Sequence, residues 1–562
     1  MTLPTTSPES PAADPMRIAI VGGGVSGLST AYYLAGRARR LGRRLDIHVY
    51  EAKETLGGNA DTVVVDLGRV MGANGPGERY LRWADLGVND ANLATYRRME
   101  QVMRDIGYLQ NMLPLQDSAC FDDRTGRVAL TDDAAMKGGV SDPRYSLVDA
   151  DSGRLWPLIR VVHQTALDLL GDIHPDYTCA RYFQDCLDDP PNMLAPAARA
   201  LGIAIDWGDP TLGERLVQVR DHYYYPRISA MYFTDPRGPA GMPLQSPFEY
   251  YQLQEGGGTP HRCYFDHGAQ TWIEALARHV EGSADGVTVS IHACAPVRVR
   301  VDAHAAVVKC GDDLVTYDLV VMANHADDAA MALTFESDAA AFGQRIEGIL
   351  GSVAYTHGYA VCHTGAARLP ANRNSWRTYN IEIRARGACS FPYRIDYVAN
   401  LHQNDPANPA FDRAGLPVYF VSLVDDLNAI PRDEILDRVT DLESLPPALR
   451  DALPHATRAH RPGAATGYRH QMPHPPVDPV LNAKAWTMFK HNVLDEPCLQ
   501  AQEAILAVNE AFARTVLDAG PAPTRAAAVP PLLFGGGWTL GAGLQEQCLQ
   551  QSERIAAWIL PD

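Results

Sequence analysis

Residues 17–27, RIAIVGGGVSG, decide the fold of this 562-residue chain. The first five form a short, mostly apolar run, which is typical of a buried parallel strand. Gly22, Gly24 and Gly27 follow at once in the spacing G-x-G-x-x-G, and residues 28–37 are predicted to form a helix. The first glycine permits a tight turn, the second lets the backbone approach a diphosphate, and the third lets helix and strand pack closely. The stretch therefore predicts the opening of a dinucleotide-binding domain.

The rest of the loop and the next strand complete this predicted site. Val25 and Ser26 lie where the helix begins, so N–H groups and the positive end of the helix dipole would face the phosphates. Residues 46–50, DIHVY, are predicted to form a second strand that ends at Glu51. An acidic residue there accepts hydrogen bonds from the adenosine ribose and repels a 2′-phosphate. Glycine-rich turns also occur for packing alone, but the flanking elements and Glu51 favour dinucleotide binding.

Composition and charge exclude several classes of protein. The formal net charge of −18 argues against a nucleic-acid partner, because phosphate binding requires a basic surface. No run of 18 or more apolar residues occurs, so no membrane-spanning helix is expected. Residues 1–15 lack the features of a signal peptide, and we expect a disordered leader on a cytoplasmic protein. The 10 cysteines show no C-x-x-C pair and no zinc spacing, so free thiols and no metal site are expected.

A glycine pair soon after Glu51 points to a known superfamily. At Leu56-Gly57-Gly58-Asn59 the sequence resembles the flavin amine oxidase and phytoene desaturase superfamily, whose members bind FAD. The resemblance implies that the pair lets backbone pass close to the flavin ribityl region. Most members have an arginine that contacts phosphate after the pair, whereas this chain has Asn59.

Later segments extend the resemblance. Residues 264–280 resemble the segment in which a glycine precedes a helix of the FAD domain, and Val297 lies where the backbone of members contacts adenine. Residues 317–328 resemble the strand that re-enters beneath the cofactor. Residues 532–555 resemble the closing motif, whose helix N-terminus stabilises negative charge on reduced flavin. Many members carry an acidic residue in this motif, and here backbone would replace it, with FAD contacts from Gly536, Gly537, Gly543, Leu544 and Gln545. A nicotinamide dehydrogenase, the alternative, does not need this closing feature.

The chain also resembles a bacterial subgroup of predicted NAD/FAD-binding proteins associated with cyclopropane fatty acid synthases. The matching segments are residues 324–327, 363–364, 368–370 and 375–376. They cover mainly FAD-associated segments, and the central third of the chain shows no such resemblance.

The spacing of the FAD-associated segments predicts two interleaved domains. We expect an α/β, Rossmann-like FAD-binding domain of residues 16–95, 259–335 and 506–562, and an α+β substrate domain of residues 96–258 and 336–505. In the substrate domain, residues 92–111 begin the first insertion with a helical pattern. Residues 355–363 and 418–424 are predicted strands suited to an antiparallel sheet.

Aromatic residues of the substrate domain are candidates for substrate contact. Sites in two-domain flavoproteins lie at the domain interface, and aromatic side chains there would suit an apolar or aromatic substrate. The candidates lie in residues 222–225, 231–233 and 248–251, and among them we expect contact from Tyr223, Tyr225, Tyr232 and Phe233. Ordinary core packing is the alternative and carries equal weight.

Catalysis by a flavin requires few acid–base groups, because the flavin takes the hydride. His325, at the end of its strand, is the first candidate proton acceptor, with helix capping or packing as the alternative. His363 is a second candidate, and Lys490 is the one lysine suited to a place near flavin N5. Arg377 and Arg384 could hold a substrate carboxylate, although exposed arginines usually serve solubility.

These observations predict an FAD-dependent oxidoreductase of the amine oxidase and desaturase type. It would remove a hydride from a small apolar or aromatic substrate, by C–C desaturation or C–N oxidation, with flavin N5 as acceptor. A redox-neutral FAD-dependent isomerase and a non-catalytic flavin-binding protein are the alternatives. Oxygen is a candidate final electron acceptor, and both covalent FAD attachment and homodimer formation stay open.

Overall fold

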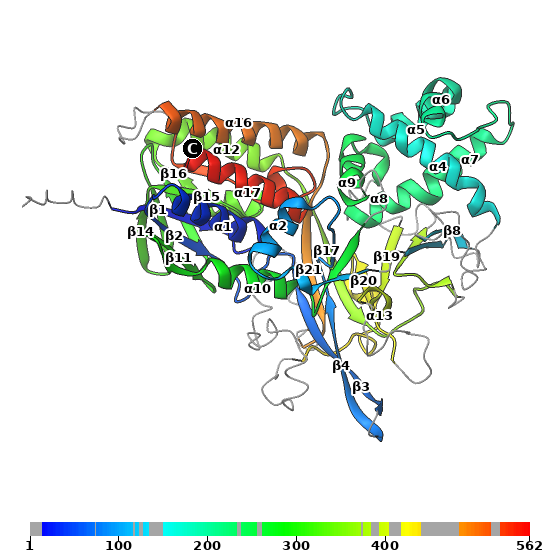
Figure 1. The fold of residues 1–562 in the computed structure, drawn as a ribbon, viewed down its shortest axis with the longest axis horizontal. Coiled ribbons are helices and arrows are strands. Elements are labelled where there is room, and N and C mark those ends of the chain that lie inside the picture. Colours follow the sequence, from blue (N-terminus) through cyan, green and yellow to red (C-terminus); the bar gives the residue numbers. More distant parts are fainter. Residues whose placement is uncertain are drawn as a thin grey trace, which may run out of the picture.

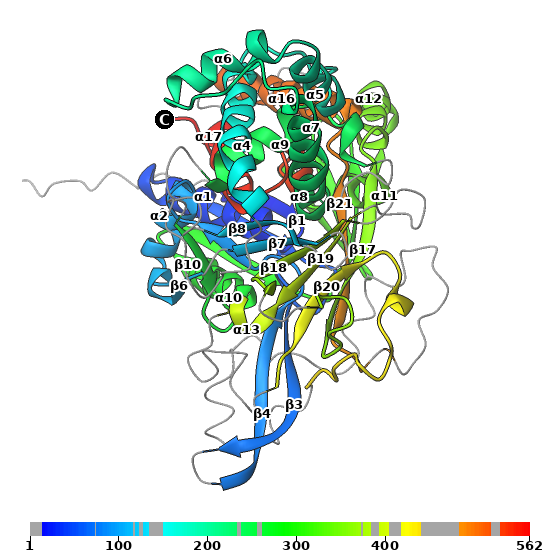
Figure 2. The same cartoon turned by 90° about the vertical axis from the view of Figure 1, so that its right-hand side faces the viewer.

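A computed structural model gives the architecture of the chain (Figures 1 and 2). It describes residues 14–72, 75–115, 118–122, 128–133, 150–232, 238–255, 261–371, 375–383, 393–403, 417–439, 481, 483–518 and 529–562. Among these residues, no helix has the length and apolarity needed to cross a membrane.

A six-stranded sheet carries the dinucleotide loop. Its order is β10-β11-β2-β1-β15-β22, and all pairs except β10–β11 are parallel. The bounds are β1 Met16–Val21, β2 Leu45–Tyr50, β10 Gly282–Ala284, β11 Val287–His292, β15 Leu319–Met322 and β22 Leu532–Phe534. Every residue of β15 and β22 is buried, as parallel strands covered on both faces require. The predicted α/β, Rossmann-like fold and its first two strands are confirmed.

Helices pack on this sheet through small residues. The helix α1 (Val25–Arg40) buries Leu28, Ala31, Leu34, Ala35 and Ala38, which repeat at helical spacing on one face. It lies against α10 (Ala269–Val280) and α17 (Gln545–Ile559), near the sheet in Figure 1. The hydroxyl of Ser552 on α17 donates to the Ser26 carbonyl at 2.9 Å. The two ends of the chain therefore meet directly beside the glycine loop.

A second sheet of the protein has seven strands. Its order is β21-β17-β20-β19-β18-β7-β8, and only the β18–β7 pair is parallel. The bounds are β7 Ser118–Asp122, β8 Val128–Asp133, β17 Tyr355–His363, β18 Tyr379–Ile383, β19 Tyr393–Val398, β20 Phe420–Val424 and β21 Trp486–Asn492. Strands are thus present at both predicted positions, residues 355–363 and 418–424.

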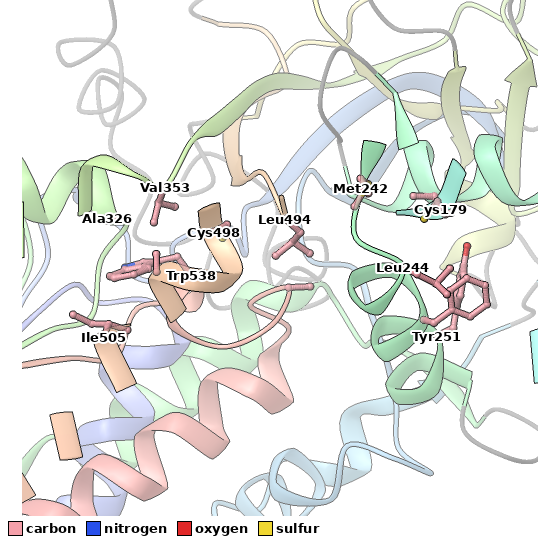
Figure 3. Packing of buried hydrophobic residues seen from close by; sticks show 14 of the residues in the cluster. Cys179, Met242, Leu244, Tyr251, Ala326, Val353, Leu494, Cys498, Ile505 and Trp538 are labelled. Atoms are coloured by element: carbon pink, nitrogen blue, oxygen red, sulfur yellow. The ribbon is translucent and has the colours of Figure 1, made fainter. Parts of the chain in front are cut away.

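A helical layer covers one side of the seven-stranded sheet (Figures 1 and 2). It consists of α4 Ala150–Leu169, α5 Cys179–Asp188, α6 Pro190–Ala200, α7 Leu212–Gln218, α8 Tyr225–Tyr232 and α9 Gln245–Glu255. The helix α8 packs on β18 and β19. Figure 3 shows buried side chains of this layer, including Leu244 and Tyr251, and a second group around Trp538 and Ile505. Both groups belong to one apolar cluster, so the layer and the C-terminal loop share a core.

Smaller elements connect these layers. The sheet β14-β13-β12-β16 comprises Asp313–Tyr317, Ala306–Cys310, Val297–Val301 and Leu333–Phe335, and the sheet β5-β9-β6 comprises Asp90–Asn92, Arg262–Phe265 and Met112–Pro114. The strands β3 (Thr62–Gly72) and β4 (Gly75–Asp85) form a ribbon that points away from the body in both views (Figures 1 and 2). Three further helices are α11 Ala326–Ala332, α12 Ala340–Gly351 and α16 Glu496–Asp518.

The helical pattern at residues 92–111 proves to be only partly helical. Asn92 ends β5, and its Oδ1 accepts from the backbone N–H groups of Ala94 and His261 at 3.1 and 2.9 Å. The helix α2 then spans only Arg97–Asp105. Gly107, at φ +72°, ends it. The prediction was wrong at its start, where a turn follows Asn92, and a left-handed glycine interrupts the pattern before a short 3₁₀ helix at Leu109–Asn111.

Candidate functional site

The glycine loop leaves the start of α1 open to a ligand. Gly22 turns the chain at φ +118°, and a Cβ on Gly27 would overlap the Gly22 carbonyl oxygen. Gly24 is the N-cap of α1, so it provides no capping side chain, and the first turn contains no acidic residue. The first N–H groups of a helix need an external acceptor. A phosphate is the natural partner at such a helix start.

Glu51 is fixed beside this loop at the end of β2. Its Oε2 accepts from the Gly23 N–H at 2.8 Å, and its Oε1 accepts from the Lys53 N–H at 2.9 Å. The side chain is 8% exposed and lines the cavity described below. The carboxylate is therefore oriented before any ligand binds.

The pair Gly57-Gly58 crosses close to the loop. The Gly57 N–H donates to the Gly23 carbonyl at 3.0 Å, and both glycines have positive φ, +122° and +63°. The Lys53 ammonium donates to the Gly58 carbonyl at 3.3 Å. Asn59 follows at the cavity wall. The glycines therefore bring backbone, without side chains, against the space in front of α1.

The C-terminal segment closes the same region. Gly536 packs on the Asn324 backbone, where a Cβ would overlap the carbonyl oxygen. Gly543, at φ +70°, leads into α17, which begins at Gln545. The Gln545 side-chain oxygen accepts from the indole N–H of Trp272 on α10 at 2.8 Å. The start of α17 is thus anchored beside the start of α10.

One cavity of about 950 Å³ joins these elements. This volume lies at the upper end of the ~300–1,000 Å³ range of ligand pockets. Its dinucleotide end contains predicted cofactor residues, namely Gly22, Gly24, Val25, Ser26, Glu51, Gly57, Gly58, Asn59, Val297, Gly537, Gly543, Leu544 and Gln545. Gly27 and Gly536 are not among the described lining residues and instead set the backbone packing behind them.

The other end of the cavity lies against the seven-stranded sheet. Its apolar and aromatic wall consists of Tyr379, Ile381, Ile395, Tyr397, Val421, Leu423 and Phe489. Residues two apart on one strand face the same side, so these strands line the space with one face. Opposite them lie Arg227 of α8 and Tyr250 and Gln254 of α9. Of these residues, only Tyr250 lies in a predicted stretch, residues 248–251, because the sheet face exists only once distant strands have paired.

An ion pair stands in this apolar wall. The Arg262 guanidinium donates to both oxygens of Asp90 at 2.7 Å, and the Tyr379 hydroxyl donates to Asp90 Oδ2 at 2.7 Å. Asp90 is 7% exposed at its side chain. Burial opposes ionisation of Asp90, but the charge of Arg262 and the hydrogen bonds outweigh it and lower the pKa. Asp90 is therefore a fixed anion with a fixed cation beside it.

His325 and Lys490 meet at the middle of the cavity. The Lys490 ammonium donates to Asp327 at 2.7 and 2.8 Å and lies 3.0 Å from Asp328 Oδ2. His325 Nδ1 lies 3.1 Å from the same Asp328 oxygen. Burial opposes ionisation of Asp328, but His325 and Lys490 lower its pKa. His325, Asp327 and Asp328 have the donor atoms of a metal site, yet Lys490 already supplies the cation there.

His363, the third catalytic candidate, lies in the seven-stranded sheet and is not among the described lining residues. It is 1% exposed, and its Nε2 is hydrogen-bonded to the Ser422 hydroxyl at 2.7 Å. Burial lowers its pKa to about 4, although the neighbouring Asp396 acts in the opposite direction. Asp396 pairs in turn with Arg368 and Arg394 at 3.1 and 3.3 Å. His363 is thus a neutral member of a buried polar network.

The predicted substrate aromatics lie largely behind the wall. Tyr223 and Tyr225 are buried in the apolar core and are not among the described lining residues. The Tyr223 hydroxyl accepts from Arg227, so it supports a residue that does line the cavity. The Tyr232 side chain and Phe233 lie outside the described residues.

The two arginines considered as carboxylate ligands have different outcomes. Arg377 is 3% exposed and donates to the Trp376 carbonyl at 2.9 Å, so it belongs to the interior and not to the surface. Arg384 lies outside the described residues. Nine of the cysteines are described, and none of these nine forms a disulfide bond.

Comparison with known proteins supports the fold. Residues 20–105 match the family described as NAD(P)-binding Rossmann-like domain. No curated protein matches the sequence. A putrescine oxidase redesigned at its cofactor site is 13% identical, with 98% of this chain and 100% of that chain covered and a TM-score of 0.48.

Two further solved structures are similar to the same extent. Cyclohexylamine oxidase from Brevibacterium oxydans IH-35A is 14% identical, with 97% of this chain and 99% of that chain covered and a TM-score of 0.47. A CLA-producing fatty acid isomerase from P. acnes is 12% identical, with 96% and 98% covered and a TM-score of 0.49. The chain is a mixed α/β protein whose residues 20–105 match an NAD(P)-binding Rossmann-like domain, and its resemblance to the flavin amine oxidase superfamily stays a prediction.

Proposed function

We propose that this chain is an FAD-dependent oxidoreductase that removes a hydride from a small apolar or aromatic substrate. One observation carries the proposal: a single cavity has a dinucleotide-binding loop at one end and an apolar sheet face at the other. A cofactor bound along the first end would present its ring to a substrate held at the second. The residues proposed for this task belong to two interleaved domains with the boundaries given above.

The residues present fit FAD. The uncapped start of α1 suits a diphosphate, and Glu51 suits ribose hydroxyls. The start of α17 suits a ring that gains negative charge. Two cavity-lining polar atoms, Asn324 Oδ1 and Trp538 Nε1, are buried without a partner among the described residues. A ligand rich in donors and acceptors would satisfy them.

A bound flavin would supply the two-electron acceptor. The chain's own contribution would be to hold the substrate and to exclude water. Ile381, Ile395 and Leu423 offer no hydrogen bonds, so they would place an apolar carbon against the ring. Lys490 is held by Asp327 and Asp328, which favours a structural and electrostatic role over proton transfer. His325, predicted from the sequence as a proton acceptor, also lines the cavity.

Colour and reducibility test the proposal. Purified protein should be yellow, and heat should release FAD and not FMN unless the cofactor is covalently attached. Anaerobic mixing with benzylamine, L-phenylalanine, linoleic acid and squalene should bleach the flavin with one compound class. Turnover without consumption of an acceptor would indicate the isomerase alternative. A folded, active protein that never binds FAD would refute the proposal.

A further inference from the structure

Residues 85–90 form one continuous strip of the cavity wall. The strip begins at the end of β4 and runs from the Gly57-Gly58 pair to the Asp90–Arg262 ion pair. The Leu86 and Val88 N–H groups donate to the carbonyls of Asp61 and Asn59 at 2.8 and 3.0 Å. The strip is therefore held rigidly beside both ends of the cavity, and it carries a carboxyl group at each of its own ends.

Asp85, at the first end, has an asymmetric environment. Its Oδ1 accepts from the Thr62 hydroxyl at 2.5 Å and from the Ala269 N–H at the start of α10 at 2.9 Å. Oδ2 accepts no hydrogen bond from the described residues, and no described cation forms an ion pair with Asp85. The residue is 7% exposed and lines the cavity. Oδ1 of Asp85 is thus held by two hydrogen bonds, and Oδ2 can accept a hydrogen bond from a group in the cavity.

The two carboxyls of the strip differ in charge. Burial raises the pKa of Asp85 to about 7, the hydrogen bonds from Thr62 and Ala269 lower it, and the nearby Asp61 carboxylate raises it. Asp90, paired with Arg262, has a lowered pKa and stays ionised. Acid–base roles in enzymes fall to carboxyls whose environments hold them near the working pH, while paired ones stay charged. Asp85 can therefore exchange a proton under conditions in which Asp90 cannot.

We propose that Asp85 is the proton-exchanging group of this cavity, and the proposal rests on the oxidoreductase function above. Oxidation removes two hydrogens from neighbouring atoms of the substrate. A bound flavin would supply the acceptor for the hydride, and the Asp85 carboxylate would take the other hydrogen as a proton when its C–H or N–H bond breaks and a double bond forms. Asp85 becomes a neutral acid and later returns the proton to water. In an isomerisation the same group would hold the proton between removal and return.

Capping of α10 is the structural alternative for Asp85. The variant Asp85→Asn separates the two roles, because its side-chain oxygen can still accept from Thr62 and Ala269 but cannot take a proton. We expect Asp85→Asn to fold, to bind FAD as the natural chain does, and to lose roughly 10²–10⁴-fold in flavin reduction by the active panel compound. A structural role alone would instead predict lost stability with the rate retained.

Infrared titration of the purified protein between pH 5 and 9 gives a readout that needs no substrate. Burial also raises the pKa of Glu274 to about 7, so two carboxyls should change protonation near pH 7 in the natural chain. The Asp85 signal should be missing in Asp85→Asn and should remain in Glu274→Gln. The control variant Asp266→Asn should retain the titration near pH 7. Asp266 precedes the same helix but is not among the described lining residues. Thr62→Val removes a donor to Oδ1, so it should move the titration to higher pH.

Each outcome separates this proposal from the proposed function. An unchanged titration in Asp85→Asn, or an unchanged rate of flavin reduction, would overturn the role of Asp85 while FAD chemistry stands. If Asp85→Asn does not fold, an unmoved titration in Thr62→Val overturns it. If apoprotein supplied with FAD never binds it but still shows the Asp85 titration, the oxidoreductase function is contradicted and the titratable group stands.

Discussion

The two ends of the cavity are built in different ways. At the dinucleotide end, most of the wall consists of backbone from glycines at 22–24, 57–58 and 537–543, placed by strand ends and helix starts. At the substrate end, the wall consists of side chains from β18, β19, β20 and β21, far apart in the sequence. At the first end, a Cβ added at Gly22 or Gly57 would lie 2.9 Å from a backbone oxygen, whereas the second end is defined by the size and polarity of each side chain. Substitutions at the two ends should therefore fail differently.

The largest effect is expected from a substitution at the dinucleotide end. Gly27→Val would drive side-chain atoms into the Gly22 carbonyl, which is backbone and cannot move aside. Overpacking costs about 1–3 kcal/mol or more, so we expect loss of stability together with loss of FAD. Thermal unfolding and the flavin-to-protein ratio measure both. Gly36→Ala in the same helix, where nothing lies within 4 Å of the added atom, should gain about 0.5–1 kcal/mol and keep FAD.

A milder change at the same end isolates one polar contact. Glu51→Gln keeps the size of the side chain but removes the charge that faces the cavity. A hydrogen bond to a charged group contributes about 1.5–3 kcal/mol, so the Kd for FAD should rise roughly 10- to 100-fold. Titration of apoprotein with FAD measures it. Glu54→Gln, three residues away and outside the described lining residues, should leave the Kd unchanged.

The stability of the seven-stranded sheet should fall with acid, because it contains the buried His363. The pKa of His363 is lowered to about 4, below the ordinary value of about 6.5, so the unfolded chain binds the proton more strongly. Stability should be complete above about pH 6.5 and fall as the pH approaches 4, by about 2 kcal/mol at pH 5.

The melting temperature followed from pH 7 to 5 tests this prediction. His363→Gln introduces a side chain that stays neutral, so it should make the melting temperature less dependent on pH. Asp396, whose pKa is lowered, contributes only at more acidic pH. If the melting temperature of the variant falls with pH as steeply as that of the natural chain, the acid effect does not come from His363.

The smallest effect concerns the substrate end alone. Tyr379→Phe removes the hydroxyl that donates to Asp90, while Arg262 keeps that carboxylate ionised. A single hydrogen bond contributes about 0.5–1.5 kcal/mol, so kcat/KM for the active panel compound should fall roughly 2- to 10-fold. FAD content and Kd should not change. Tyr359→Phe on the same sheet, outside the described lining residues, is the matched control.

The dinucleotide end could be predicted because its signals in the chain are local. A turn that needs Gly22, a close approach that needs Gly27 and an acid after β2 each depend on residues within one βαβ unit. The closing segment at Gly536 and Gln545 was found through resemblance, and the structure brings both beside that unit. The helix at 92–111 was overextended, since apolar spacing alone does not reveal where a turn intervenes.

By itself, the sequence determined a Rossmann-like dinucleotide-binding domain with an open helix start, because steric limits on glycines act over a few bonds. Only the tertiary structure decided which side chains face the substrate. Tyr379, Asp90 and Arg262 meet because sheets assembled from distant segments bring them together. It also decided the contrast between Asp85 and Asp90, since the pKa of a carboxyl depends on burial and on neighbouring charges that no local pattern records.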